Sequence, residues 1–178
     1  MTRVPDRYRP LVERVVSSCA QGDPIESRMR VVADAIWEAM GWRPEPGEPH
    51  PEGRPYSWIG FYTREDGADE MVLAPSRDTP ACNPIGLHGM CGRSCVDGAP
   101  VLIDDVRTLG EHYVACDPRD QSEIVIPVFE ESGRCFGVLD GDSFDLNAFD
   151  EDDIAGLTAL VEASGLTTTG HAAALLRL

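Results

Sequence analysis

Three short stretches of this 178-residue sequence combine reactive side chains with turn-forming residues. The first, ACNPIGLHGMCGRSC at residues 81–95, contains three of the cysteines and a histidine. The second, YVACDP at residues 113–118, contains Cys116. The third is LDGDS at residues 139–143, and Glu123 precedes it in what we expect to be the neighbouring strand. Because binding and catalytic residues concentrate on loops and strand ends, these stretches are the candidates for a functional site.

The carboxylates of the third stretch suggest acid chemistry. Asp140 and Asp142 share one face of an extended strand, because side chains alternate with period two. With Glu123 near them, their mutual repulsion is expected to raise at least one pKa. A carboxylic acid that stays protonated near neutral pH can serve as a general acid. The alternative is a solvated acidic turn, and the pattern alone leaves both open.

The cysteines suggest redox chemistry. The N-terminus, MTRVPDRYRP, lacks the apolar segment of a secretory signal, which predicts a cytoplasmic protein in which a disulfide framework is disfavoured. Cys19 and Cys135 lie in apolar segments and are predicted to be core residues. Cys116 is either a nucleophile in a loop or a buried small side chain. The presence of Cys82 and Cys91 in similar surroundings favours a nucleophile with resolving partners.

Zinc binding is the alternative use of these thiols. Cys91 and Cys95 have a C-x₃-C spacing, and His88, His112 and Cys116 could complete a tetrahedral set. Structural zinc sites usually use two close pairs, and the sequence has no second one. We therefore expect no metal, and we expect Cys95 to be packed.

Composition narrows the class of ligand. The formal net charge is -16, with 15 basic and 31 acidic residues, whereas nucleic-acid binding draws on clustered Lys and Arg. No apolar run approaches the roughly 20 residues that a membrane span requires. Elimination of nucleic acid and membrane leaves a small molecule as the expected ligand.

Periodicity predicts two helices at the start of the chain. The first runs from Pro10 to Ala20, and the second follows Asp23-Pro24-Ile25-Glu26, which reads as a capping box, and ends at Gly41. Residues 43–55 (RPEPGEPHPEGRP) predict an exposed proline-rich loop, because each proline removes a backbone donor.

Beyond this loop, the pattern predicts a sheet. The expected strands are Ser57–Thr63, Glu70–Ala74, Val101–Ile103, Glu123–Phe129 and Arg134–Leu139, with a short helix at Cys91–Val96. Asp150 caps a closing helix that ends at Gly165. The tail, 166–178, could extend that helix or hang free. The predicted class is α+β, a central antiparallel sheet with helices packed on it. Trp58 and Tyr62 share one strand face, as core residues or as a pocket wall.

Together these segments resemble the free methionine-R-sulfoxide reductases, a family of single GAF domains. The resemblance runs from Trp58 to Asp153 and rests on six blocks in the family's order. These blocks are WIGFY, PAC, GMCG, ACD, SEIVIP and GVLDGDS, at residues 58–62, 80–82, 89–92, 115–117, 122–127 and 137–143. It implies a single GAF domain over 1–178, with helices in 1–41, the loop at 43–55, the sheet and closing helix at 57–165, and the tail.

The resemblance also implies roles for the cysteines. Cys116 would attack the sulfoxide sulfur and become a sulfenic acid, which Cys82 would resolve as a disulfide. Cys91 would pass oxidation onward, and a thioredoxin-like dithiol would restore the enzyme.

The same resemblance assigns the pocket. Glu123, Asp140 and Asp142 would bind polar groups of the substrate and help protonate the departing oxygen, while Trp58 and Tyr62 would wall the pocket. The implied substrate is free methionine-R-sulfoxide, with no cofactor, and the protein would be a homodimer. The rival interpretation is a GAF module that binds a small molecule without chemistry, as a sensor does.

Three departures from the family pattern affect these expectations. The spacing from Cys82 to Cys91 is one residue shorter, and the loop at 43–55 is longer. Gly141 replaces the apolar residue between the two aspartates, which is expected to loosen the packing behind them. If the shortened segment adapts, Cys82 pairs with Cys116; otherwise Cys91 takes its place. We expect the Cys82–Cys116 pair, because a loop with Pro and Gly adapts more readily than a paired strand.

Overall fold

The computed structural model describes residues 3–20, 22–43, 51–78, 80–113 and 116–178. The helices of this part are α1 (Arg9–Ser18), α2 (Ile25–Met40), α3 (Met90–Asp97), α4 (Glu151–Ala163) and a 3₁₀ segment, η1 (Val106–His112). The strands are β1 (Trp58–Thr63), β2 (Glu70–Arg77), β3 (Ile85–Gly86), β4 (Val101–Ile103), β5 (Ser122–Phe129), β6 (Cys135–Ser143) and β7 (Leu176–Arg177). The chain is thus α+β, as predicted.

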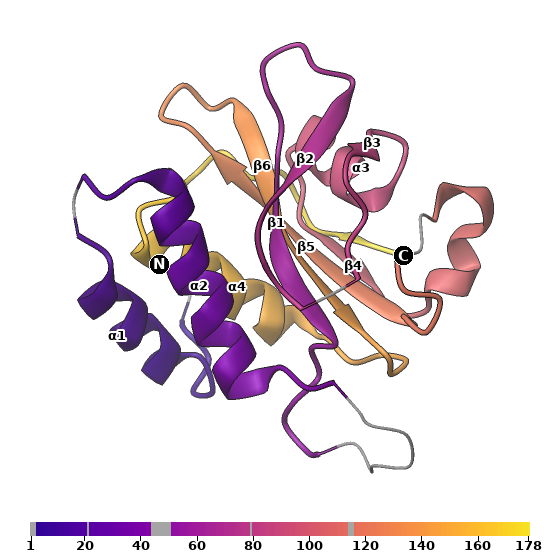
Figure 1. Cartoon of the computed structure of the whole chain (residues 1–178), viewed down its shortest axis with the longest axis horizontal. Coiled ribbons are helices and arrows are strands. Elements are labelled where there is room, and N and C mark those ends of the chain that lie inside the picture. Colours follow the sequence, from indigo (N-terminus) through magenta and orange to yellow (C-terminus); the bar gives the residue numbers. More distant parts are fainter. Residues whose placement is uncertain (1–2, 21, 44–50, 79, 114–115) are drawn as a thin grey trace.

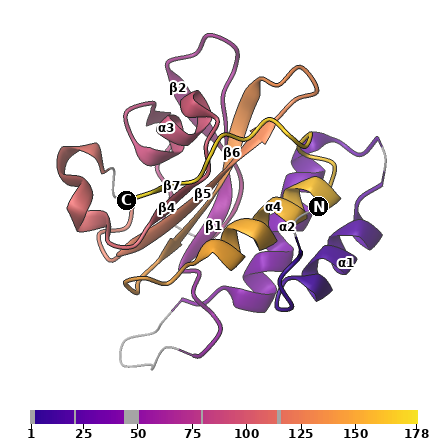
Figure 2. The ribbon, with the colours of Figure 1, turned by 180° about the vertical axis from the view of Figure 1, so that it is seen from behind.

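The strands form one sheet in the order β3-β2-β1-β6-β5-β4-β7. Every neighbouring pair is antiparallel except β4 and β7, which run parallel. The predicted central antiparallel sheet is confirmed, and the parallel pair of β4 and β7 is added at one edge. There the tail, left open by the sequence, lies along β4 near the C-terminus (Figure 2). Leu178 accepts a backbone hydrogen bond from Asp104 and donates one to Leu102, which extends this edge pairing.

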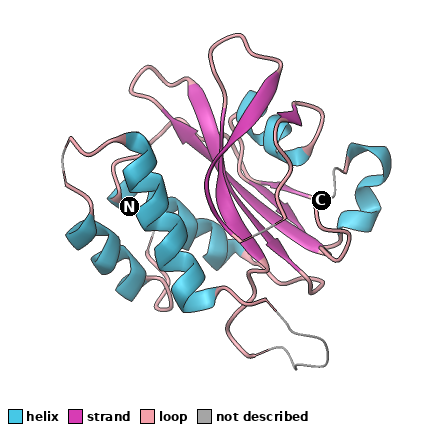
Figure 3. Ribbon diagram, viewed as in Figure 1, coloured by secondary structure: helices cyan, strands magenta, loops and turns pink. Residues whose placement is uncertain are grey.

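The sheet separates two hydrophobic clusters. Helices α1, α2 and α4 cover one face, while α3 lies on the other side of the sheet (Figures 1 and 3). Side chains of β1 alternate between them: Ile59 and Phe61 join the cluster under the helices, and Trp58 and Tyr62 join the cluster around α3. The period-two pattern of the strands thus decides which residues face α3.

Two helix predictions need correction at their starts. Helix α1 begins at Arg9, one residue before the predicted start, and ends at Ser18. The predicted capping box of α2 is wrong, because Pro24 occupies the cap position and α2 has no side-chain cap. The carboxylate of Asp23 instead accepts a hydrogen bond from the backbone of Ala20, at 2.7 Å, which closes the turn between the helices. Asp150 caps α4 in a full capping box with Asp153, and Gly165 follows with a positive φ, as predicted.

Strand β2 continues past its predicted end. The sequence predicts an end at Ala74, and the next residue, Pro75, cannot donate to a ladder. In the structure, the register changes between Gly60 and Tyr62, so that Ala74 and Pro75 lie opposite Phe61 alone. This β-bulge accommodates the proline, and β2 runs on to Arg77. Strand β6 likewise continues beyond Leu139 to Ser143.

A buried polar network supports the start of β1 and the middle of β6. The Tyr8 hydroxyl donates to Asp153 of α4 and meets the Tyr56 hydroxyl at 2.9 Å. A Cβ added at Gly141 would stand 2.8 Å from the Tyr56 ring and 3.1 Å from Ile59. The expected loosening behind the aspartates is therefore wrong, because the Tyr56 ring fills the space that an apolar side chain would take.

The proline-rich loop is described in part. Residues 44–50 lie outside the described residues, and positions 51–55 contain a turn and no helix or strand. Arg54 joins this segment to α2 by donating to the carbonyl oxygens of Gly41 and Glu38. Among the described residues, no helix is long and apolar enough to span a bilayer.

Candidate active site

A pocket opens on the α3 side of the sheet. Its empty space, including the open mouth, is about 550 Å³. Strands β1, β5 and β6, the first turn of α3 and the loops around Cys82 and Cys116 contribute the lining. The lining residues are Trp58, Tyr62, Pro80, Ala81, Ile85, Gly86, Gly89, Met90, Cys91, Tyr113, Cys116, Asp120, Glu123, Asp140 and Asp142. Every predicted site residue is among them except Cys82, which is bonded to Cys116.

Three acids meet on the floor of this pocket. In the register of β5 and β6, Glu123 lies opposite Asp142, and Val125 lies opposite Asp140. Alternation therefore sends all three carboxylates to the same face, as the sequence predicts. Glu123 and Asp140 are each only 6% exposed, which does not fit a solvated acidic turn.

Burial changes the protonation of these acids. It raises the pKa of Glu123 well above its usual range, and the charge of Asp140 adds to the effect. The pKa of Asp142 is raised well above its usual range by the same two causes. Burial also raises the pKa of Asp140, to about 7. The pocket therefore holds carboxylic acids that keep protons at neutral pH.

A fourth acid, Asp120, was missed by the sequence analysis. It lines the pocket, is 7% exposed, and accepts a hydrogen bond from the Ser57 hydroxyl at 3.1 Å. Burial raises the pKa of Asp120 to about 6, and its charge contributes to the raised pKa of Glu123 and Asp142. Asp120 lies in a loop, where no periodicity reports the direction of a side chain. The sequence signal that could have pointed to Asp120 as a site residue was its position four residues after Cys116.

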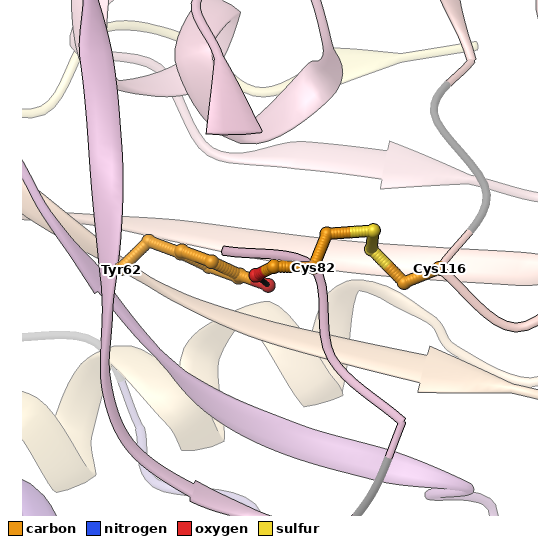
Figure 4. The surroundings of a disulfide bond; sticks show 3 residues. All are labelled: Tyr62, Cys82 and Cys116. Carbon is orange, nitrogen blue, oxygen red and sulfur yellow. Dashed lines mark hydrogen bonds between the residues drawn. A yellow bond between two sulfur atoms is a disulfide. The ribbon is translucent and has the colours of Figure 1, made fainter. Parts of the chain in front are cut away.

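The cysteine pair closes one side of the pocket. Cys82 and Cys116 form a disulfide, with their Cα atoms 5.4 Å apart across 34 residues of sequence. The expected pairing is therefore present despite the shortened segment after Cys82. The Tyr62 hydroxyl donates to the carbonyl oxygen of Cys82 at 2.9 Å and reaches it from β1 (Figure 4). Tyr62 thus holds the Cys82 segment in addition to walling the pocket.

Further contacts fix the segment that follows Cys82. The side-chain oxygen of Asn83 accepts a hydrogen bond from the backbone of Leu73 at 3.1 Å. Strand β3 then pairs with the start of β2, with Ile85 opposite Met71. These contacts tie the Cys82 segment to the sheet edge, so that a loop of this length still reaches Cys116.

An ion pair fixes the segment that follows Cys116. The carboxylate of Asp117 accepts from the backbone of Arg119 at 3.0 Å and from its guanidinium at 2.6 Å. The guanidinium of Arg119 also lies over the Phe144 ring, 4.3 Å from its centroid. Asp117 and Arg119 thus close a tight turn between Cys116 and Asp120, both of which line the pocket.

Cys91 belongs to the same cluster but differs in character. It lies in the first turn of α3, is 6% exposed and shares a hydrogen bond with Asp140. Burial raises the pKa of the Cys91 thiol well above its usual range, and the charge of Asp140 adds to this. A thiol that stays protonated is a weak nucleophile. Cys91 is thus suited to donating a hydrogen bond to Asp140 and poorly suited to attacking a substrate.

Two buried polar atoms of the lining residues lack partners. Neither Nε1 of Trp58 nor Oδ1 of Asp140 has a hydrogen-bond partner within the described part of the chain. Buried polar groups are almost always paired, so an unpaired donor and an unpaired acceptor indicate a polar ligand. The N-terminus of α3 adds further donors, because the first N–H groups of a helix lack intrahelical acceptors.

Three of the residues that line the pocket, Cys91, Glu123 and Asp140, could also ligate a cation. The ligand atoms of Cys91, Glu123 and Asp140 all lie within 4.8 Å of one another. A metal would have to displace the protons that burial favours on these groups. Of the zinc set considered from the sequence, Cys116 is bonded to Cys82, and His88 is exposed. The side chain of His112 lies outside the described residues, and Cys95 is buried, as predicted, on another part of α3.

Comparison with known proteins agrees with this architecture. Residues 52–167 match the model of the GAF domain family. Over 107 residues, the chain is 41% identical to Protein YtsP of Bacillus subtilis and, over another 107-residue alignment, 38% identical to the free methionine-R-sulfoxide reductase of Escherichia coli. These alignments cover 60% and 59% of this chain and 64% and 62% of the relatives. The chain thus spans a little under two thirds of each of these two relatives.

Similarity to solved structures extends over more of the chain. The X-ray structure of free methionine-R-sulfoxide reductase from Neisseria meningitidis, in complex with its substrate, superposes with a TM-score of 0.73 at 29% identity. That match covers 94% of this chain and 95% of the other.

Proposed function

Because the chain belongs to the GAF domain family, and because its pocket joins a cysteine pair to buried acids, we propose that it reduces free methionine-R-sulfoxide to methionine. The observation that carries this proposal is the position of the Cys82–Cys116 pair beside carboxylic acids that hold protons at neutral pH. The similarity to reductases of that name supports the choice of substrate.

The chemistry explains why a thiol and acids are needed together. A sulfoxide is neutral, and its oxygen departs only when it is protonated. The Cys116 sulfur attacks the sulfoxide sulfur while Glu123 or Asp142 delivers a proton to the oxygen. In sum, the thiol and the sulfoxide give a sulfenic acid on Cys116 and the thioether methionine. The oxygen is transferred from substrate to enzyme, so that Cys116 is oxidised by two electrons and the substrate is reduced by two.

Resolution follows from the pairing seen in the structure. The Cys82 thiol attacks the sulfenic acid, a disulfide forms and water leaves. A thioredoxin-like dithiol then reduces the disulfide by exchange and becomes a disulfide itself. The Cys82–Cys116 bond of the structure is the bond that this resolution step would form, which supports the proposal.

The two ends of a free amino acid match the remaining polar groups. The unpaired Oδ1 of Asp140 accepts from the substrate ammonium, which also favours the ionised form of that carboxyl. The α-carboxylate meets N–H groups at the start of α3, where Gly89 and Met90 line the pocket. The ring of Trp58 contacts the methyl thioether end, and its N–H donates to a substrate oxygen. A sulfoxide within a polypeptide lacks both the ammonium and the carboxylate, so the pocket selects the free amino acid.

The test uses racemic free methionine sulfoxide with dithiothreitol. Chiral chromatography should show loss of the R epimer, a matching gain of methionine, and little loss of the S epimer or of sulfoxide in a peptide. Cys116→Ser should form no methionine, whereas Cys19→Ser, a thiol outside the pocket lining, should keep full activity. Binding of the sulfoxide without any conversion would contradict the proposal and favour a sensor module. Equal loss of both epimers would refute the stereochemical part.

A further inference from the structure

Two cysteines that the reaction does not use lie against each other at the far end of α3. The Cys95 sulfur is 3.6 Å from the carbonyl oxygen of Cys135, and the two thiols share a side-chain hydrogen bond. The Cys135 sulfur lies 3.1 Å from the carbonyl oxygen of Gly137. Cys95 is 4% exposed, and Cys135 is partly buried. This contact joins a helix to a strand 40 residues later in the sequence.

The surroundings of the pair are positively charged. The guanidinium of Arg64 hydrogen-bonds to Cys95, and the charge of Arg134 also acts on it. Arg134 is in turn paired with Glu130 and donates to the carbonyl oxygen of Arg64 at 3.4 Å. Hydrogen bonding from Cys135 and the positive charges lower the pKa of Cys95 to about 7.

The two thiols differ in character. Hydrogen bonding with Cys95 and burial raise the pKa of Cys135 well above its usual range. Cys95 is therefore the cysteine of the pair that ionises more readily, and Cys135 stays a thiol. A low-pKa thiol beside a second cysteine that can resolve it is a feature of redox-sensing cysteines, although Cys95 is more buried than is usual for them.

We propose that Cys95 and Cys135 form a second redox site, at which a peroxide oxidises Cys95 and Cys135 closes the disulfide. The Cys95 thiolate attacks one peroxide oxygen, the other oxygen leaves as water or an alcohol, and Cys95 becomes a sulfenic acid. The Cys135 thiol then attacks that sulfur and a second water leaves. The two thiols together lose two electrons, and the peroxide gains them.

This site is distinct from the pocket. Neither Cys95 nor Cys135 lines it. Cys135 begins β6, and Asp140 lies five residues further along the strand, which is about 16 Å of extended chain. A Cys95–Cys135 bond would link the C-terminal half of α3 to the start of β6, while the first turn of α3 remains at the substrate site.

Cys19 supplies the internal reference. It is more exposed than Cys95, but burial and the charge of Asp23 raise its pKa above the usual value. If accessibility governed oxidation, Cys19 would react first. If thiolate character governs it, Cys95 reacts first. At pH 7 a thiol with a pKa of about 7 is about half ionised, against about 1% at its ordinary value near 9. A low-pKa thiolate is also a weaker nucleophile, which reduces the gain in reaction rate about eightfold. The remaining advantage in the oxidation rate of Cys95 is about sixfold.

The experiment uses the full chain carrying Cys82→Ser and Cys116→Ser, so that the disulfide of the proposed reaction cannot form. The reduced protein is treated with one equivalent of hydrogen peroxide, alkylated after unfolding and mapped by mass spectrometry. We expect a Cys95–Cys135 disulfide, with Cys19 still alkylated. Adding Cys135→Ser should leave a sulfenic acid on Cys95 that dimedone traps.

Arg64→Gln tests the charge that activates the pair. Arg64 does not line the pocket, so this variant in the otherwise unmodified chain should keep its methionine-forming activity, which also shows that it folds. In the background without Cys82 and Cys116, this variant should oxidise Cys95 severalfold more slowly, with the oxidation of Cys19 unchanged. The proposal is overturned if Cys19 oxidises before Cys95, or if Cys95 oxidises without a bond to Cys135. Equal Cys95 rates with and without Arg64 would overturn the activating role of the guanidinium.

Discussion

Replacing Asp140 with asparagine should make the protein more stable, and more so as the pH rises. Asp140 is 6% exposed, and burial raises its pKa from 3.8 to about 7. A raised pKa means that the folded state holds the proton more tightly than the unfolded state. The contribution of Asp140 to stability is therefore fully present below about pH 4 and is lost as the pH rises through about 7.

The magnitude follows from the linkage between proton binding and folding. Each pKa unit corresponds to about 1.4 kcal/mol, so the full shift corresponds to at most about 4 kcal/mol. The isoelectric point is near pH 4.4, and a protein with little net charge tends to associate at that pH. The measurements are therefore made well above it. Between pH 5.5 and the pKa of Asp140 in the folded protein, near 7, the free energy of unfolding still falls by about 2 kcal/mol. Removing this charge also reduces repulsion on Glu123 and Asp142, which acts in the same direction.

The assay is urea unfolding of the reduced protein and of Asp140→Asn at pH 5.5 and pH 8. The difference in unfolding free energy between variant and parent should shift by about 2 kcal/mol in favour of the variant between the two pH values. Asp69→Asn, at an exposed position, is the matched control and should show no such shift. The same difference at both pH values, or a greater loss of stability by Asp140→Asn at pH 8, would refute the reasoning.

Four further substitutions test the parts of the site. Asp142→Asn and Glu123→Gln should each lower turnover by at least about tenfold with the fold retained, since proton donation typically contributes 10²–10⁴-fold. Circular dichroism checks the fold, and steady-state kinetics measure the turnover. Normal turnover in both variants would remove the acids from the mechanism. Tyr62→Phe loses the hydrogen bond to the Cys82 carbonyl, so quenched-flow mapping should show slower disulfide formation after an unchanged first release of methionine. An unchanged rate of disulfide formation would show that this hydrogen bond does not affect resolution. Gly141→Ala should cost about 1–3 kcal/mol in urea unfolding by overpacking, and a neutral result would show that the aromatic ring behind it moves freely.

The acids of the site could be predicted from the sequence, because alternation fixes the face of every residue in a paired strand. Asp140 and Asp142 had to share a face, and the register of β5 and β6 then brought Glu123 to the same place. For the same reason β1, β2, β4, β5 and β6 were predicted within a few residues, whereas the two-residue strands β3 and β7 were not predicted. The predicted end of β2 at Ala74 is too early, because the bulge that accommodates Pro75 depends on the partner strand.

The features that were missed depend on contacts between distant segments. Asp120 reaches the pocket from a loop, and loops carry no period that reports where a side chain points. The pairing of β7 with β4 joins the chain end to a strand in the middle of the sequence. The contact between Cys95 and Cys135 likewise follows from the packing of α3 on β6, which no local pattern encodes.

The most direct test of the proposed reduction is a single turnover without any added reductant. Fully reduced protein is mixed with excess free methionine-R-sulfoxide, quenched with acid and analysed for both methionine and disulfides. The mechanism predicts about one methionine per protein and, at the same rate or later, a Cys82–Cys116 bond in the same amount, with Cys91 still a thiol. Absence of methionine, or methionine formed while Cys82 and Cys116 both remain thiols, would contradict it.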